Sequence, residues 1–371
     1  MGEYNIMFTQ HTQFDHLNAL PIRTWRRLGI NDTQVSAHVT GGEFSGTCDI
    51  SLSAELSAFP KGASLIGFGS QGVTSALGAE AERFTLEHRN AGLCIRAPRG
   101  TAVSEPSAAR YVIGEAMSLC DCNIVIAEPH SNLDIIITYA SDIASSGASF
   151  HSGMTRVIAG EGAVVRIATV QTLNSGAVHL SDFAAVCEAG ARVEYTQIEL
   201  GASVTVSGCH IDLQGDSSSA HTDTFYFGDG ERKLDFNNII RHAGERTISE
   251  MNAGGALFGS AEKIYRGTLD FIRGSKKAAG AERENTLLFS PKARNRSAPL
   301  ILCGEEDVDG RHAATIGRLD AAKLFYMLSR GLTETDAKRL MTVSLLDAAL
   351  RPVPDVGLRE YAGKYLSERI I

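Results

Sequence analysis

The sequence contains few aromatic residues, few prolines and no long hydrophobic run. Phe, Tyr and Trp make up 7% of its 371 residues, with a single Trp and nine Pro. No apolar stretch approaches the about 20 residues that a membrane-spanning helix needs, and the start of the chain lacks the pattern of a signal peptide. The net charge of −8 and the lack of a Lys/Arg run argue against nucleic-acid binding. We therefore expect a cytoplasmic protein that binds neither membranes nor nucleic acid.

Seven cysteines are scattered along the chain, and their odd number does not suggest a disulfide framework. Without a secretory signal they are expected to be reduced thiols. Cys120 and Cys122 would lie on the same face of a strand. Because free cysteine is among the most buried residue types, we interpret this pair as two small buried residues rather than as metal ligands.

Glycine is abundant, with 37 residues, and it heads a repeated pattern in the middle of the chain. Four segments begin with Gly-Ala and continue as short alternating runs rich in Val: GAVVRI at 162, GAVHLS at 176, GARVEY at 190 and GASVTV at 201. Their starts are 14, 14 and 11 residues apart, and GASLIG at 62 has the same shape. Short β-runs at such spacing are typical of a sandwich or of a solenoid.

We favour the solenoid because each coil of a β-helix repeats the same alternation of inward and outward side chains. Glycine at the corners lets the backbone turn without a clash at Cβ. The interval between repeats is then one side of a coil plus one corner. The sequence has no Asn-Gly pair, so tight hairpins are expected to be few.

Helical spacing replaces the β pattern after Gly317. RLDAAKLFYMLSRG has one apolar helical face. The next predicted helix begins after Thr333 as N-cap, with Asp336 three residues on in a relative of the capping box, and Pro352 ends it. A third helix is predicted from about residue 356 to 369.

The predicted organisation therefore has three parts. Residues 1–34 form a short N-terminal segment with a possible helix around PIRTWRRLG. Residues 35–317 form the all-β body, a β-helix, and residues 318–371 form a C-terminal α-helical domain.

No motif of a common enzyme class stands out. GFGSQG at 67 matches the dinucleotide-binding pattern only formally, because the segment after it suits a strand as well as a helix. The sequence has no G-x-S-x-G and no distinctive Ser/His/Asp arrangement. His221 and His242 stand among polar residues, and we expect both at the surface.

The stretch LILCGEEDVDGRHAATIG, residues 300–317, combines a lone thiol, an acid cluster and a histidine. Cysteine, imidazole and carboxylate together suit iron or zinc. However, Cys303 and His312 are two ligands nine residues apart, far short of a four-ligand signature. From the residues alone, a strand, a solvated turn and another strand is the simpler interpretation, and a metal or sulfur site is the alternative.

The C-terminal half resembles the SufB/SufD family, the scaffold subunits of the Suf iron–sulfur cluster assembly machinery. The resemblance rests on Tyr265-Arg266-Gly267, on Glu284-Asn285 before TLLFSP, on His312 followed by Ala313 to Thr315, and on LFYMLSRGL. LNALPIRTWRRLGIN near the start is similar to a family motif as well. The resemblance implies a right-handed parallel β-helix with a C-terminal helical domain, and a platform rather than an enzyme.

The resemblance also implies site residues. Cys303 falls where SufB-type proteins hold a cysteine implicated in cluster assembly, His312 falls on the interface histidine, and Cys187 matches a second SufB cysteine thought to receive sulfur. Cys303 and His312 would then be the metal ligands of a transient, weakly held iron–sulfur cluster.

Departures from the family pattern surround the histidine. SufB chains usually flank it with glutamates, but here the neighbours are Arg311 and Ala313. SufD chains place a cysteine two residues before it, where this chain has Gly310. We expect Asp307 and Asp309 to replace the lost glutamate oxygens.

The partners implied are a SufC-like ABC-type ATPase on the C-terminal helices, sulfur donor proteins, and a second SufB/SufD-type subunit in a homodimer or heterodimer. Charge reversal at Lys338 and Arg339 is expected to weaken ATPase binding. Two alternatives are a structural SufD-like partner without cluster ligands and a β-helix enzyme acting on carbohydrate. The lone Trp25 and the lack of a signal peptide argue against the enzyme.

Overall fold

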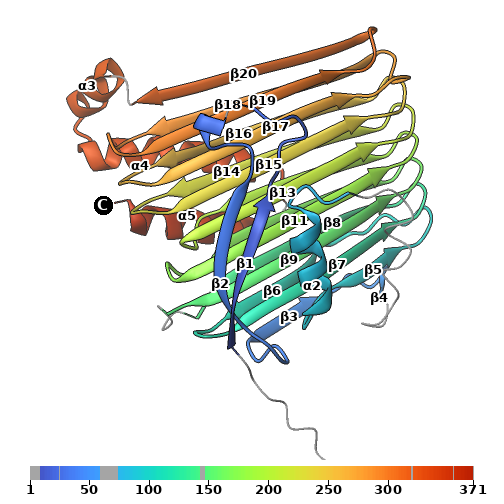
Figure 1. Ribbon diagram of the computed structural model, residues 1–371, viewed down its shortest axis with the longest axis horizontal. Helices are drawn as coiled ribbons and strands as arrows, with labels where there is room; N and C mark the ends of the chain where they lie inside the picture. The colour runs from blue at the N-terminus through green and yellow to red at the C-terminus, as the bar shows by residue number, and fades with distance from the viewer. Residues whose placement is uncertain are drawn as a thin grey trace, which may run out of the picture.

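Two nine-stranded sheets face each other and form a β-solenoid (Figure 1). The computed structural model describes residues 9–24, 26–58, 74–142, 147–318, 321–353 and 355–370. The segments GASLIG and GFGSQG and residue Trp25 lie outside the described residues. Successive strands alternate between the sheets, and neighbours within a sheet are parallel except for the pairs β3–β6 and β4–β5. The predicted parallel β-helix body is therefore confirmed.

The strands of each sheet follow in spatial order from the C-terminal end of the solenoid. The odd-numbered sheet contains β19 (Arg294–Cys303), β17 (Glu262–Phe271), β15 (Lys233–His242), β13 (Val204–Leu213), β11 (Ala177–Cys187), β9 (Ser149–Ala159), β7 (Ser118–Ala127), β5 (Cys94–Ala97) and β4 (Ser57–Ala58). The even-numbered sheet contains β20 (Val308–Arg318), β18 (Ala278–Leu288), β16 (Ile248–Leu257), β14 (Ser219–Gly228), β12 (Arg192–Glu199), β10 (Val164–Thr172), β8 (Asn132–Ser141), β6 (Ser107–Ile113) and β3 (Thr47–Ser51).

The Gly-Ala repeats mark the corners, as the sequence predicts. The strands that follow the four repeats are β10, β11, β12 and β13, on alternating sheets. Gly162 and Gly190 have φ of 63° and 64°, a left-handed conformation that glycine adopts without a steric penalty. The interval between repeats is thus one strand plus one corner, and two intervals make one coil.

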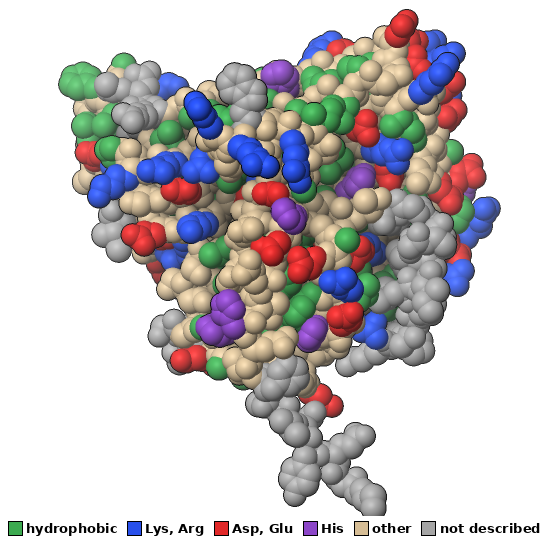
Figure 2. All heavy atoms as spheres, viewed as in Figure 1, with side chains coloured by type: hydrophobic (Ala, Val, Ile, Leu, Met, Phe, Trp, Pro, Cys, Tyr) green, Lys and Arg blue, Asp and Glu red, His purple; other side chains and the backbone are tan. Residues whose placement is uncertain are grey.

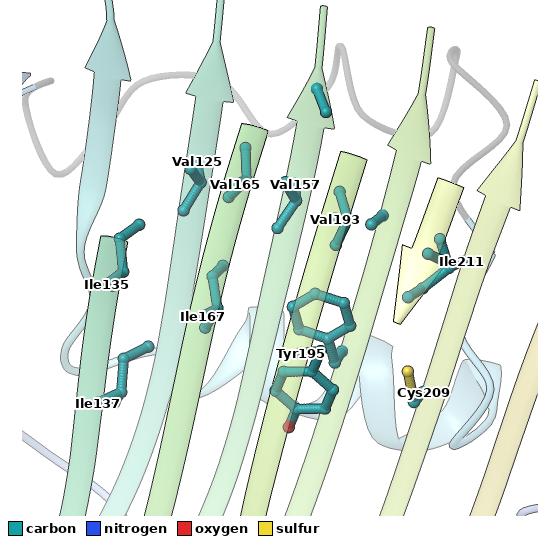
Figure 3. Close-up of a cluster of buried hydrophobic side chains, with 14 of the residues drawn as sticks. Val125, Ile135, Ile137, Val157, Val165, Ile167, Val193, Tyr195, Cys209 and Ile211 are labelled. Carbon is teal, nitrogen blue, oxygen red and sulfur yellow. The ribbon is translucent and has the colours of Figure 1, made fainter. Parts of the chain in front are cut away.

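Between the sheets, one half of the interior is apolar (Figure 3). Aliphatic side chains from successive coils, such as Val125, Val157, Val165 and Val193, stack there and are almost fully buried. Cys209 and Tyr195 belong to the same cluster. Buried polar side chains, such as Asp121, His151 and Glu199, lie in the interior as well.

The N-terminal segment covers the outer face of the odd-numbered sheet (Figure 1). β1 (Thr9–Leu17) and β2 (Thr33–Thr40) pair antiparallel, and with α2 (Ala79–Glu87) they pack on residues of β7, β9, β11 and β13. The buried Arg156 of β9 holds this layer, because its guanidinium bonds to Asp182 and lies 2.7 Å from Glu82 of α2. The helix expected around PIRTWRRLG is a single 3₁₀ turn, η1 (Arg26–Leu28).

Of the three C-terminal helices, the last two cover the outer face of the even-numbered sheet, and the first packs against the second. They are α3 (Ala321–Ser329), α4 (Glu334–Leu350) and α5 (Val356–Arg369). Leu346 of α4 and Leu366 of α5 are buried in a cluster with Ile198 and Phe225 of the sheet. Thr333 caps α4 in a capping box with Asp336, as the sequence predicts. The predicted domain boundaries stay predictions, with the 34/35 boundary inside β2 and β20 ending at Arg318.

The prediction for His242 is wrong. This histidine ends β15 and is fully buried, because the strand alternation turns it inward. Its ring stacks on Phe271 with 4.6 Å between centroids, and its nitrogens lie 2.7 Å from Thr247 Oγ1 and 2.8 Å from Ser249 Oγ. The polar residues that follow His242 in the sequence form a corner of the solenoid. The prediction was wrong because it took these exposed neighbours as a sign that His242 is exposed too. His221 is partly exposed, with 29% of its side chain accessible.

Candidate functional site

Four of the five predicted site residues, all except Cys187, lie at the C-terminal end of the solenoid, where the last coil is open (Figure 1). In the described part of the chain, β19 and β20 have no partner strand on their outer edges. Cys303 ends β19 and His312 lies in β20, and both are exposed. Because side chains alternate along a strand, Cys303 faces the same side as Ile301, and His312 the same side as Val308. Ile301 and Val308 pack against the core, so Cys303 and His312 both face the interior side of the open coil.

These residues do not form a closed metal site within one chain. Among the described residues, no group of three or more His, Cys, Asp or Glu could hold a metal ion. Asp307 lies in the turn, and its carbonyl accepts a hydrogen bond of 2.6 Å from the backbone of Lys277. Asp309 faces the opposite side of β20 from His312 and is bonded to Arg311, with Arg311 Nε 2.9 Å from Asp309 Oδ1. Both aspartates stay predicted ligands.

Sequence reasoning missed the carboxylates beneath the open coil. His312 is in register with Glu282 of β18, which is 3% exposed. Burial and then repulsion from Glu284 raise the pKa of Glu282 to about 8, and its Oε2 atom has no hydrogen-bond partner in the described structure. Glu284 is bonded to the fully buried Lys263, whose pKa burial lowers to about 8. The alternation of AGAERENTLL could have found this pair, because it turns both glutamates inward.

Each residue of the Tyr265-Arg266-Gly267 run has a structural role next to these carboxylates. Tyr265 points into the interior and is fully buried. Arg266 points outward, binds Asp235 and donates to the carbonyl of Ile30 at 2.6 Å, which ties the N-terminal segment to the solenoid. A Cβ at Gly267 would lie 2.4 Å from the Glu282 carboxyl, so glycine makes room for that group.

Cys187 lies elsewhere and is sealed. It is fully buried in the apolar core, and burial raises the pKa of its thiol. The strand registers place it in one column with Leu213, His242, Phe271 and finally Cys303. At about 4.8 Å per strand, the two cysteines are about 19 Å apart. The structure therefore does not bring them together.

A second polar group fills the N-terminal part of the interior. His151 Nδ1 lies 2.7 Å from His179 Nδ1, and His151 Nε2 lies 2.6 Å from Asp121 Oδ1. His179 Nε2 lies 3.5 Å from Glu199 Oε1. All four side chains are buried. The signal in the sequence is a separation of 28 to 30 residues, one coil, between inward-facing positions.

The chain is thus a parallel β-solenoid protein with a helical layer, and its open last coil carries an exposed thiol and an exposed imidazole. Residues 111–344 match the family model for "SUF system FeS cluster assembly, SufBD core domain". This chain belongs to the SufB/SufD family of iron–sulfur cluster assembly proteins.

Individual relatives agree with this assignment. The iron-sulfur cluster assembly protein SufD of Bacillus subtilis is 27% identical over 283 residues, 76% of this chain and 64% of that protein. SufB of the same organism is 21% identical over 264 residues, 71% of this chain and 57% of that protein. A SufBD family protein of Mycobacterium leprae is 25% identical over 261 residues, 70% of this chain and 30% of that protein. The chain thus spans less than two thirds of the length of each. None of the helices that the structure describes has the length and apolar character to cross a membrane.

Proposed function

We propose that this chain is a non-enzymatic, cytoplasmic scaffold subunit on which an iron–sulfur cluster is assembled from iron and sulfide. The supporting observation is the pair Cys303 and His312, exposed on the interior side of the open coil above the buried Glu282. Thiolate and imidazole are ligands that iron accepts. Glu282 supplies the carboxylate that the residues flanking His312 lack. An open site with few ligands suits a cluster that is passed on rather than kept.

A second SufB/SufD-type subunit is proposed to complete the ligand set. β19 and β20 are 10 and 11 residues long and end the two sheets. Exposed strand edges of this length are templates for pairing with another chain. In a two-fold dimer the same edge meets its own copy, which doubles the number of thiols and imidazoles. A paralogous subunit would serve in the same way, and sulfur donor proteins would approach this edge.

The C-terminal helices are proposed to bind an ABC-type ATPase, through α3 rather than through Lys338 and Arg339. On α3, Phe325 is 73% exposed and Tyr326 is 59% exposed. Figure 2 shows hydrophobic side chains gathered there, at the upper left. Exposed apolar patches of this kind mark interaction sites. Arg339, in contrast, donates to the carbonyls of Ser367 and Ile370 and so holds α4 on α5.

Anaerobic reconstitution with iron and sulfide tests the scaffold role. Wild type, Cys303→Ala and the matched control Cys48→Ala, another exposed cysteine, are compared with the dimer fraction recorded alongside. We expect cluster absorbance to be lost in Cys303→Ala alone, with the dimer intact. Equal absorbance in all three proteins, or none in any, would instead assign the chain the role of a structural SufD-like partner.

A pull-down tests the ATPase surface. We expect Phe325→Asp to abolish co-purification of the ATPase while the far-ultraviolet circular dichroism stays unchanged. The control is Lys364→Asp on the solvent side of α5, a residue whose side chain is 78% exposed. Retained binding by the α3 variant would show that the ATPase docks elsewhere.

A further inference from the structure

A cavity on the outer face of the first coils contains two cysteines that the scaffold role does not use. Its volume is about 410 Å³, and it lies far from the open coil, beside β5 and β7. Cys94 of β5 is half-buried and Cys122 of β7 is 2% exposed, and both line this cavity. Gly42, Glu43, Arg89 and Asn90 complete much of its wall.

The strand register determines the relative position of the two cysteines. Cys94 is in register with Ile124, and Ala91 is in register with Asp121. Cys122 is therefore displaced by two residues from Cys94 on the neighbouring strand, on the same face. Strand spacing and rise per residue then give a Cα separation of about 8 Å. This exceeds the about 7 Å that a disulfide tolerates, so the two sulfurs are placed to be joined by an atom between them rather than to each other.

The charges around the cavity favour a bound complex that carries a small net negative charge. Burial raises the pKa of Cys122 to about 12, and it also raises the pKa of Cys94, so both thiols keep their protons when nothing is bound. The guanidinium of Arg89 opposes this shift at both thiols. A monovalent cation that displaces both protons forms a complex of net charge −1, which Arg89 offsets. A divalent tetrahedral ion would need further ligands, and although Glu43 also lines the cavity, no group of three His, Cys, Asp or Glu among the described residues is placed to hold a metal ion.

A third sulfur lies next to the pair. Met154 of β9 is in register with Cys122, is 3% exposed and belongs to the same buried cluster, against which Cys94 packs. Thiolate and thioether ligands select soft metals such as Cu(I). We propose that Cys94 and Cys122, with Met154 as a weaker third ligand, bind one soft monovalent cation of the Cu(I) class. Binding converts two thiols and one cation into a dithiolate complex and releases two protons.

An anaerobic Cu(I) titration against a chromogenic Cu(I) chelator tests this site. The reference protein carries Cys303→Ser and Cys48→Ser, which removes the two exposed cysteines. We expect it to bind one equivalent of Cu(I) with release of two protons. Cys94→Ser and Cys122→Ser should each weaken the affinity by roughly a hundredfold, and Met154→Leu by roughly tenfold.

Cys120→Ser is the matched control, since Cys120 lies on the same face of β7 but does not line this cavity. It should bind as the reference does. X-ray absorption of the Cu(I) complex should show sulfur ligands alone. Because Cys94 is only partly buried, the Cys94→Ser variant should fold normally. Equal affinity in Cys94→Ser and Cys120→Ser, or no Cu(I) retained by the reference protein, would overturn the proposal. These results do not depend on cluster assembly at Cys303.

Discussion

Acidification should destabilise this protein through His242, the histidine that lies in the column between Cys187 and Cys303. Its ring is fully buried against Phe271, and its nitrogens meet the hydroxyls of Thr247 and Ser249. A positive charge here would be poorly solvated, because neutral hydroxyls cannot replace water or a counter-ion. Burial accordingly lowers the pKa of His242 to about 4.

The size and sign of the effect follow from proton linkage. In the unfolded chain the histidine binds a proton below about pH 6.5, but in the folded chain it does so only near pH 4. The stability that the neutral ring contributes is therefore present above about pH 6.5 and is lost as the pH falls toward 4. At about 1.4 kcal/mol per pKa unit, the loss is about 2 kcal/mol between pH 7 and pH 5.

Urea unfolding followed by circular dichroism at pH 7 and pH 5 measures this loss. His242→Gln keeps hydrogen-bonding groups but does not titrate, so we expect its acid-induced loss of stability to be smaller than that of wild type by about 2 kcal/mol. His221→Gln is the control with the opposite sign, because Asp223 raises the pKa of His221 and its contribution is lost as pH rises. If His242→Gln loses as much stability as wild type, the burial argument is refuted.

Two further substitutions test the contacts that build the site. Arg156→Met should cost about 3–5 kcal/mol in urea unfolding because it leaves Asp182 buried without its cation, whereas Arg246→Met at an exposed ion pair should cost at most about 1 kcal/mol. Gly267→Ala should displace the Glu282 carboxyl, since the new Cβ would lie 2.4 Å from it. We expect this variant to lose about 1–3 kcal/mol and to retain less reconstituted cluster, and normal stability would show that Glu282 has room to move.

The fold was predictable because its signals are local. Gly-Ala heads followed by Val-rich alternation define a strand and its corner, and Thr333 with Asp336 defines the start of α4. Which strands lie side by side is not local. Inward-facing polar residues such as His151 and His179 meet only because corners of unequal length bring them into register one coil apart. Glu282 was missed for the same reason, because the sequence does not show that β18 pairs with β20 and so places Glu282 beside His312.

The column that ends at Cys303 bears on how sulfur would reach the proposed cluster. Of the two cysteines that the family resemblance implicates, Cys187 is sealed in the apolar core and Cys303 is open to solvent. Leu213, His242 and Phe271 fill the positions between them, and all three are fully buried. Sulfur carried from Cys187 would have to open several coils of a close-packed interior, which costs much of the stability of the solenoid. In the proposed scaffold role, delivery of sulfide directly to the open coil at Cys303 needs no such opening, and we propose it as the route.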